Sequence, residues 1–372
     1  MVNIHIQRVA LYHVRVPLKK SFITHLQHVN ERESIFIELT DSDGHTGVGE
    51  CVSFTSPWYT EETVQTSWEM LESWIIPAIF NQSFSHPDEL DSCLSFIKGN
   101  HMAKATVNHA MWDLFAIKED QPLWQIIGGA SRPIEAGTVV ATATEEKMIR
   151  EIDAAVDQGY KRIKIKITPK SNPDQLKKII DQYPQTLFSA DANGAFTENT
   201  ISLLHTFDDC GFALIEQPFS EQYNNVSAIA QKTMKTPFAL DESITSLSAV
   251  EEMRERQSGK IVVMKQGRVG GLSNALRIHD YCINAGIPIF VGGMIEFGVS
   301  KAFNIAFATL PGVQFPGDFS SSTHFWNEDL AKPPITVHKG EIQLSNLPGV
   351  GVALNHEIMG KYEVRKKEFF AK

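Results

Sequence analysis

Short apolar runs alternate with amphipathic stretches along most of the chain after residue 126. The amphipathic stretches, such as EEKMIREIDAAVDQGY and SLSAVEEMRERQSG, carry apolar residues at helical spacing. The apolar runs between them are GTVVATA (137–143), RIKIKI (162–167), LFSADAN (187–193), FALIEQP (212–218), PFALDES (237–243), KIVVMKQ (260–266), PIFVGGM (288–294) and VQFPGDF (313–319). Eight such units at a nearly constant period predict an α/β fold, a parallel (β/α)8 barrel over residues 126–330.

The first 125 residues follow a different pattern, which predicts an α+β capping domain over residues 1–125. SIFIELTDSDGHTGVGE has two strand-like runs with a hairpin signal at Asp43-Gly44. HMAKATVNHAMWDLFAIKED (101–120) has apolar residues at helical spacing. The last segment, residues 331–372, contains the strand-like stretch GEIQLSNLPGVGVAL, and we expect this segment to return to the N-terminal domain.

Every second side chain of RIKIKI is a cation. On a β-strand, Arg162, Lys164 and Lys166 share one face, and the three isoleucines share the other. The strands of a parallel barrel are covered on both sides. We therefore expect Lys164 and Lys166 to point into the mouth of the barrel, where their charges must be balanced by neighbouring groups.

Charged residues recur near the ends of five successive predicted strands. They are Lys166, Asp191, Glu216, Asp241 and Lys265, separated by 25, 25, 25 and 24 residues. This interval matches one βα unit, so the five side chains are expected at equivalent heights on neighbouring strands. That height is the C-terminal rim, where such barrels build their active sites.

Three converging carboxylates repel one another, which favours a bound divalent ion with hard oxygen ligands. A salt-bridge network without chemistry is the alternative for any single residue, but two lysines flanking the carboxylates argue against it for the set. A carboxylate-bound Mg²⁺ can hold a substrate carboxylate while a lysine removes a proton from the neighbouring carbon. That lysine must be neutral, and the positive charge of Lys164 favours the neutral amine at Lys166. Lys265 is then a second acid/base, or a cation beside the developing negative charge.

Composition excludes several other classes of protein. The formal net charge is −10 and no long basic run is present, which argues against nucleic-acid binding and against binding to a membrane surface. No run of about 18 apolar residues predicts a transmembrane helix, and the first twenty residues resemble a strand rather than a signal peptide. The four scattered cysteines predict reduced thiols and a cytoplasmic location.

Several motifs together are typical of one family. They are Lys164-Ile165-Lys166, DANG (191–194), IEQP (215–218), LDES (240–243), MKQGRVGGL (264–272), SPWYTEETV (56–64), KGNHMAKA (98–105), GGMIE (292–296) and PGDFSSS (316–322). They resemble the muconate-lactonising subgroup of the enolase superfamily, and within it the bacterial o-succinylbenzoate synthases, some of which also racemise N-acylamino acids. The resemblance runs nearly end to end and implies the same barrel with a capping domain.

The resemblance implies Mg²⁺ ligation by Asp191, Glu216 and Asp241, with Mn²⁺ as a substitute, and general acid/base chemistry by Lys166. The implied reaction is the syn-dehydration of 2-succinyl-6-hydroxy-2,4-cyclohexadiene-1-carboxylate to o-succinylbenzoate, a step of menaquinone biosynthesis. It passes through an enediolate that Lys265 stabilises. The alternative is N-acylamino acid racemisation or dipeptide epimerisation, with the two lysines as opposed bases. A non-catalytic metal-binding scaffold is a remote alternative.

Further positions are expected around the small carboxylate substrate. A loop near residues 21–29 would cover it. The expected lining residues are Phe22, Thr138, Asn193, Gly293, Met294 and Ile295, with Glu242 as a partner of the Lys265 region. Two positions depart from the family pattern: Gln266 stands where proline is common, and Phe297 where a small polar residue is usual, which bears on side-chain specificity. The sequence leaves the oligomeric state open, a homo-oligomer included.

Overall fold

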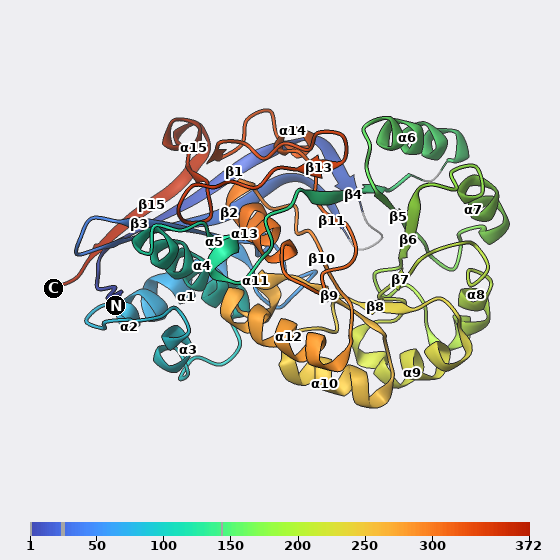
Figure 1. Ribbon diagram of the computed structural model, residues 1–372, viewed down its shortest axis with the longest axis horizontal. Coiled ribbons are helices and arrows are strands. Elements are labelled where there is room, and N and C mark those ends of the chain that lie inside the picture. Colours follow the sequence, from blue (N-terminus) through green and yellow to red (C-terminus); the bar gives the residue numbers. More distant parts are fainter. Residues whose placement is uncertain (1, 24–26, 143) are drawn as a thin grey trace.

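The computed structural model describes residues 2–23, 27–142 and 144–372. An antiparallel sheet with its neighbouring helices forms one end of the molecule, and a barrel of parallel strands forms the other (Figure 1). We call the first part the cap and the second the barrel. Within these ranges, no helix combines the length and the apolar character needed to cross a membrane.

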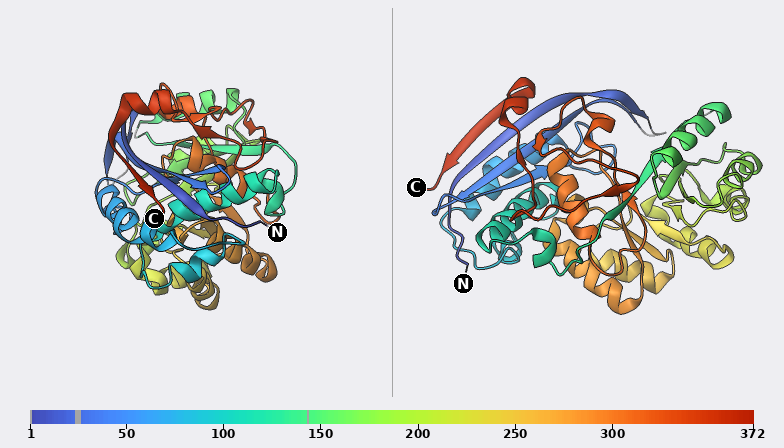
Figure 2. Two further views of the ribbon diagram at one scale, coloured as in Figure 1. Left: turned by 90° about the vertical axis from the view of Figure 1, so that its left-hand side faces the viewer. Right: turned by 45° about the horizontal axis from the view of Figure 1, so that its top comes forward.

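The cap sheet has the strand order β15-β1-β2-β3. Its strands are β1 (Ile6–Ile23), β2 (His28–Asp41), β3 (Thr46–Cys51) and β15 (Glu363–Phe370). The expected hairpin joins β2 to β3, where Gly44 has a φ of 87° and the Asp41 carboxylate accepts hydrogen bonds from the N–H groups of Asp43 and His45. The C-terminal strand β15 lies along β1 and completes the sheet, as Figure 2 shows.

One long helix of the cap packs against this sheet. The cap helices are α1 (Val64–Met70), the π-helical turn η1 (Leu71–Ile75), α2 (Ile76–Ile79), α3 (Glu89–Cys93), α4 (His101–Lys118) and α5 (Leu123–Ile126). β3 approaches α4 so closely that a Cβ atom at Gly47 or Gly49 would lie 2.2 or 2.1 Å from a carbonyl oxygen of the helix. Only glycine fits there. On its other side α4 contacts the barrel helices α11 (Gln266–Val269) and α12 (Leu272–Ala285), so it is buried around most of its circumference.

The barrel contains all eight strands that the sequence predicts. They are β4 (Ile134–Val140), β5 (Arg162–Lys166), β6 (Leu187–Asp191), β7 (Ile215–Glu216), β8 (Phe238–Leu240), β9 (Ile261–Met264), β10 (Ile289–Val291) and β11 (Gly317–Asp318). Their order is β10-β9-β8-β7-β6-β5-β4-β11, and an isolated bridge between Ile289 and Val313 brings the two ends together. The result is a nearly closed parallel barrel, which confirms the predicted fold class.

Helices follow most of these strands and cover the outside of the barrel (Figure 1). Besides α11 and α12 they are α6 (Glu145–Asp157), α7 (Pro173–Ile180), α8 (Ile201–His205), α9 (Asn224–Thr233), α10 (Leu247–Arg256), α13 (Gly298–Ala308) and α14 (Ser322–Phe325), with 3₁₀ turns η2 (Glu198–Thr200) and η3 (Glu221–Tyr223). Local sequence sets their ends. Asn172 and Ser246 cap α7 and α10 by accepting backbone N–H groups, and Gly286 ends α12 at a φ of 68°.

The C-terminal segment touches both parts of the molecule. Its elements are β12 (Ala331–Lys332), β13 (Glu341–Ile342), β14 (Ala353–Leu354) and α15 (His356–Tyr362), followed by β15. β13 pairs with β4 of the barrel, β12 pairs with β14, and β15 pairs with β1 of the cap. This segment therefore ties the barrel to the cap sheet.

Two buried charged residues of the cap sheet, Arg32 and Glu50, also fasten the cap to the barrel. We call them the junction pair. The Arg32 guanidinium donates hydrogen bonds to three carbonyl groups of the cap and to the Ile295 carbonyl of the barrel. The Glu50 carboxylate accepts from the N–H groups of Phe297 and Ser300 at the start of α13, at 2.8 Å each. The polar atoms of both side chains are thus satisfied mainly by backbone groups.

Candidate active site

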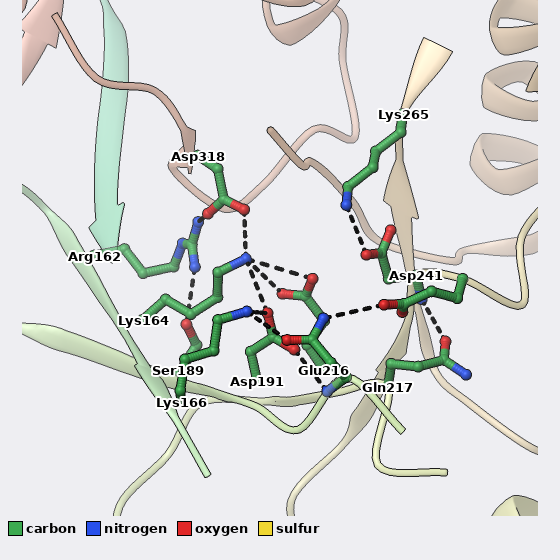
Figure 3. A network of polar contacts seen from close by, with 12 residues as sticks. Arg162, Lys164, Lys166, Ser189, Asp191, Glu216, Gln217, Asp241, Lys265 and Asp318 are labelled. Carbon is green, nitrogen blue, oxygen red and sulfur yellow. Dashed lines mark hydrogen bonds and ion pairs between the residues drawn. The ribbon is translucent and has the colours of Figure 1, made fainter. Parts of the chain in front are cut away.

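The five charged residues of the 25-residue interval lie together at one end of the barrel (Figure 3). Lys166, Asp191 and Glu216 are the last residues of β5, β6 and β7, and they are neighbours in the parallel register. Asp241 follows β8, and Lys265 follows β9. The structure therefore brings all five together at the C-terminal rim. Both faces of β5 are buried, which explains why its cations need partners.

Lys164 and Lys166 both reach carboxylates of the neighbouring strands. Lys166 Nζ donates to Asp191 Oδ2 at 2.6 Å and to Asn193 Oδ1 at 2.5 Å. Lys164 Nζ donates to Glu216 Oε2 at 3.1 Å and lies 3.5 Å from Asp191 Oδ2. The two amines therefore share one carboxylate oxygen. Lys164 and Lys166 lie two residues apart on the same face of β5. The charge of Lys164 therefore lies directly beside Lys166.

Asp318, which the sequence reasoning did not single out, completes this side of the site. It ends β11 and accepts hydrogen bonds from Arg162 and Lys164 (Figure 3). The fully buried Arg162 also donates to Ser189 Oγ at 2.8 Å. A signal for Asp318 was available, because it lies in the predicted eighth strand, VQFPGDF, and in the PGDFSSS motif.

On the opposite wall, Lys265 and Arg268 share the carboxylate of Asp241. Three strands separate β9 from β5 in the barrel. Lys265 Nζ donates to Asp241 Oδ2 at 2.8 Å, and Arg268 from α11 donates to the other oxygen. The hydroxyl of Tyr59, a residue of the cap, accepts from Lys265 Nζ at 2.8 Å and from Arg268 Nη1 at 2.6 Å. Sequence reasoning missed both Tyr59 and Arg268, although each lies in a motif of the family pattern.

Burial and neighbouring charges shift the pKa values of the rim carboxylates in different directions. Burial raises the pKa of Glu216 to about 8, with neighbouring carboxylates adding to the rise and Lys164 opposing it. Burial also raises the pKa of Asp241, but Arg268 and Lys265 outweigh it and hold that pKa well below its usual range. Burial therefore dominates at Glu216, whereas the two neighbouring cations dominate at Asp241.

One cavity of about 380 Å³ is bordered by residues of both the barrel rim and the cap. Lys164, Lys166 and Lys265 border it, as do all the lining residues expected from the sequence: Phe22, Thr138, Asn193, Gly293, Met294 and Ile295. Phe22 belongs to β1, near the tip of the β1–β2 hairpin. Residues 24–26 of the expected covering loop lie outside the described residues. The volume suits a small organic ligand.

Glu242 interacts with the charge of Lys265, the expected partner, and also reaches the Lys166 side through a hydrogen bond. Its Oε1 accepts a hydrogen bond from Asn193 Nδ2 at 3.0 Å, and Asn193 in turn accepts from Lys166. Glu242 therefore supports the Lys166 side of the site through Asn193, and its charge also acts on Lys265. Burial raises the pKa of Glu242 to about 7. Asn193 has a φ of 43°, a left-handed conformation that asparagine adopts more readily than most residues.

The loop after β10 forms a tight wall of the cavity. A Cβ atom at Gly292 would lie 2.7 Å from Cε of Lys265, so glycine leaves room for the lysine. Ile295 has a φ of 55°, which is unusual for a β-branched residue and indicates local strain. Arg32 of the junction pair donates to the Ile295 carbonyl at 3.3 Å and helps to hold this conformation.

The two departures from the family pattern lie behind the cavity. Phe297 does not border the cavity; its ring stacks on Trp326 with 4.1 Å between the ring centroids. Phe297 therefore makes no direct contact with the cavity through which it could affect side-chain specificity. Gln266 is also buried. Its Oε1 lies 3.1 Å from Nε2 of His109 in α4, and its Nε2 donates to the Phe303 carbonyl of α13 at 3.0 Å.

The chemistry of the donor set at the rim suits a divalent cation, although among the described residues these three carboxylates are not gathered within ligating distance of one point. Asp191, Glu216 and Asp241 offer two carboxylate oxygens each, from the ends of three neighbouring strands. Such hard oxygen donors suit Mg²⁺ or Mn²⁺. A divalent ion would add positive charge beside Glu216, whose pKa is raised by burial and by neighbouring carboxylates.

Comparisons with known proteins agree along nearly the whole chain. The family model "Mandelate racemase / muconate lactonizing enzyme, N-terminal domain" matches residues 6–128, and "Enolase C-terminal domain-like" matches residues 147–358. The chain is 41% identical to the o-succinylbenzoate synthase of Bacillus subtilis over 99% of each chain. It is 33% identical to the N-succinylamino acid racemase of Thermus thermophilus over 92% of each.

A solved structure of an enolase superfamily member from Listeria innocua has the same fold. Its TM-score to this chain is 0.96 at 33% sequence identity, and the match covers 99% of this chain and 100% of that one. Relatives this similar over nearly their full length, and a family model that spans more than half the residues, lead to one conclusion: the chain belongs to the enolase superfamily.

Proposed function

We propose that the protein is an Mg²⁺-dependent enzyme that dehydrates 2-succinyl-6-hydroxy-2,4-cyclohexadiene-1-carboxylate to o-succinylbenzoate, in the cytoplasm and as part of menaquinone biosynthesis. One observation carries the proposal: Lys166 and Lys265 border one cavity from strands on opposite sides of the barrel, with three carboxylates on the strands between them. The similarity to o-succinylbenzoate synthases supports this choice of reaction within the superfamily.

In this proposal Lys166 carries the proton. As a free amine, it removes the proton on the carbon that bears the ring carboxylate. The electron pair of that C–H bond forms the new ring double bond, the C–O bond of the neighbouring hydroxyl breaks, and the ammonium of Lys166 returns its proton to the departing oxygen as water. Asp191 and Asn193 hold Nζ at the cavity wall, so the same amine reaches both positions on one face of the ring.

The remaining residues stabilise charge. Asp191, Glu216 and Asp241 would hold Mg²⁺, which supplies positive charge next to the substrate carboxylate when it is bound. Lys265 faces the cavity from the other wall and offers an ammonium group to the negative charge that develops as the proton leaves. Tyr59 and Arg268 fix the position of that ammonium. Lys164 lies beside Lys166, and both amines contact the Asp191 carboxylate.

A second candidate activity is racemisation of N-succinylamino acids. It needs two bases on opposite faces of one carbon, and Lys166 and Lys265 border the cavity from opposite walls. The similarity to an N-succinylamino acid racemase supports it. The two activities use the same residues, so one protein can carry both.

Product identification tests the proposal. The purified protein with Mg²⁺ is incubated with the cyclohexadiene substrate, and the loss of diene absorbance is followed while o-succinylbenzoate is identified by mass spectrometry. Optical rotation of N-succinyl-L-phenylalanine measures the second activity in parallel. Dehydration at least as efficient as racemisation supports the proposal. Racemisation without dehydration would replace the first candidate by the second.

A further inference from the structure

One buried lysine that borders the cavity lacks an acidic partner. Lys301 of α13 is 2% exposed. Its Nζ donates to the Ser320 carbonyl at 3.0 Å, and no carboxylate of the described residues lies within ion-pair distance. The other buried lysines of this cavity, Lys164 and Lys265, each form ion pairs with carboxylates. An ammonium group has three N–H donors and is costly to bury unpaired.

The groups around Lys301 do not supply the missing negative charge. Burial lowers the pKa of nearby His324, and the charges of Lys301, Lys20 and Lys19 lower it further. Glu151, a carboxylate that acts on His324, pairs with Lys20 at 3.0 Å. This part of the cavity wall is therefore cationic.

Asp329, which also packs near the start of α13, is occupied by other donors. It accepts hydrogen bonds from the N–H groups of Gly298 and Ala331 and from the Ser322 hydroxyl. The wall of the whole cavity contains six lysines and four carboxylates. A ligand with more than one negative charge suits such a wall.

We propose that Lys301 binds the remote carboxylate of the substrate, the one at the end of its succinyl chain, while the reacting carboxylate lies at the barrel rim. The inference rests on the proposed function, because it takes a succinyl-bearing carboxylate as the ligand. The geometry supports it because Lys301 and the two rim lysines border the same cavity but come from different elements, α13, β5 and the end of β9. Lys301 thereby selects succinyl substrates over shorter or uncharged acyl groups.

Binding of a matched pair of ligands to the Mg²⁺-loaded protein tests the proposal. o-Succinylbenzoate and 2-butyrylbenzoate have the same ring, carboxylate and ketone, but the second ligand has a methyl group in place of the remote carboxylate. Calorimetry should show that the wild-type protein binds o-succinylbenzoate about 10- to 100-fold more tightly, the range for a hydrogen bond between ionised partners. Equal affinities for the two ligands would overturn the proposal without any variant.

Substitution of the lysine gives the second arm. Lys301→Gln should weaken the binding of o-succinylbenzoate by the same factor and leave the affinity for 2-butyrylbenzoate unchanged. The preference for o-succinylbenzoate then disappears. Lys301→Met is the alternative if Lys301→Gln does not fold. Lys232→Gln, which removes an exposed lysine of α9, is the charge-matched control and should keep the preference. If Lys301 only fixes the Ser320 backbone, the variant binds both ligands more weakly by the same factor. That result contradicts the proposal.

Activity measurements separate this inference from the proposed function. The preference for N-succinyl over N-acetyl amino acids in racemisation should fall about 10-fold or more in Lys301→Gln, with kcat for the N-acetyl substrate kept. A wild-type protein that performs neither reaction contradicts the proposed function, whereas the ligand-binding comparison still decides the role of Lys301. An active protein whose acyl preference does not depend on Lys301 contradicts only the inference.

Discussion

The protein buries ionisable side chains in two places, and the two differ in the groups that hydrogen-bond to them. At the junction pair, Arg32 and Glu50 are held mainly by backbone carbonyl and N–H groups. At the barrel rim, lysines and carboxylates pair with each other through flexible side chains. Backbone partners cannot leave without unfolding the local structure, whereas side-chain partners can be exchanged for a metal ion or a substrate. The difference separates charge that holds the fold from charge that is available for chemistry.

The largest expected effect is at the rim. Lys166→Met should lower kcat for dehydration by roughly 10²- to 10⁴-fold, the contribution of a positioned general acid/base. The free energy of unfolding should change little, because the side chain borders a cavity and is not part of the apolar core. Lys161→Met, an exposed lysine that directly precedes the same strand, is the control and should keep full activity. Unchanged kcat in Lys166→Met would remove the residue from the mechanism.

The junction pair should show the opposite behaviour. Glu50→Ala leaves the buried N–H groups of Phe297 and Ser300 without an acceptor, at about 1–3 kcal/mol for each unpaired group. We expect the free energy of unfolding in urea to fall by roughly 2–4 kcal/mol in total. Mg²⁺ affinity of the folded fraction should stay within a factor of three. A variant that keeps its stability but loses Mg²⁺ binding would reverse the assignment of the two regions.

A smaller effect concerns the dependence of stability on pH. Burial raises the pKa of Glu50 to about 8 from its usual 4.5, with the two backbone hydrogen bonds opposing the rise. The folded state therefore binds a proton that the unfolded state has released. The stabilising contribution is complete below pH 4.5 and is lost as the pH rises through 8, by up to about 1.4 kcal/mol per pH unit.

The variant Glu50→Gln removes that ionisation. Its free energy of unfolding should be lower at pH 5 than that of the wild type, because the amide replaces one acceptor by a donor. Between pH 5 and 8 the free energy of unfolding of Glu50→Gln should decline less steeply with rising pH than that of the wild type. Urea titrations at four pH values measure both slopes. Parallel slopes would show that Glu50 is ionised throughout this range.

The repeating parts of the structure were predictable from the sequence, and the parts made by long-range contact were not. The strand period placed Lys166, Asp191 and Glu216 at one rim because consecutive parallel strands are neighbours in space. The period alone does not reach Asp318, which lies 53 residues after Lys265, more than two such intervals. Tyr59 could not be found in this way, since it approaches Lys265 from the cap and no interval relates the two residues.

The junction pair illustrates the same limit. Arg32 and Glu50 are ordinary charged residues of two strands in the sequence, and their buried positions depend on how α13 and the loop after β10 meet the cap sheet. The hydrogen bond between Asn193 and Glu242 was not predicted from the sequence. Alternation along a strand gives the face of a residue, but a left-handed residue such as Asn193 changes the direction of the chain just beyond the strand end.

Calorimetric titration of the protein with Mg²⁺ tests the central claim most directly, because the claim is that the rim charges are exchangeable and the junction charges are not. The account predicts one Mg²⁺ per chain for the wild type, an affinity at least about 10-fold weaker in Asp241→Asn, and wild-type affinity in folded Glu50→Gln. Equal Mg²⁺ affinity in the wild type and Asp241→Asn would contradict it.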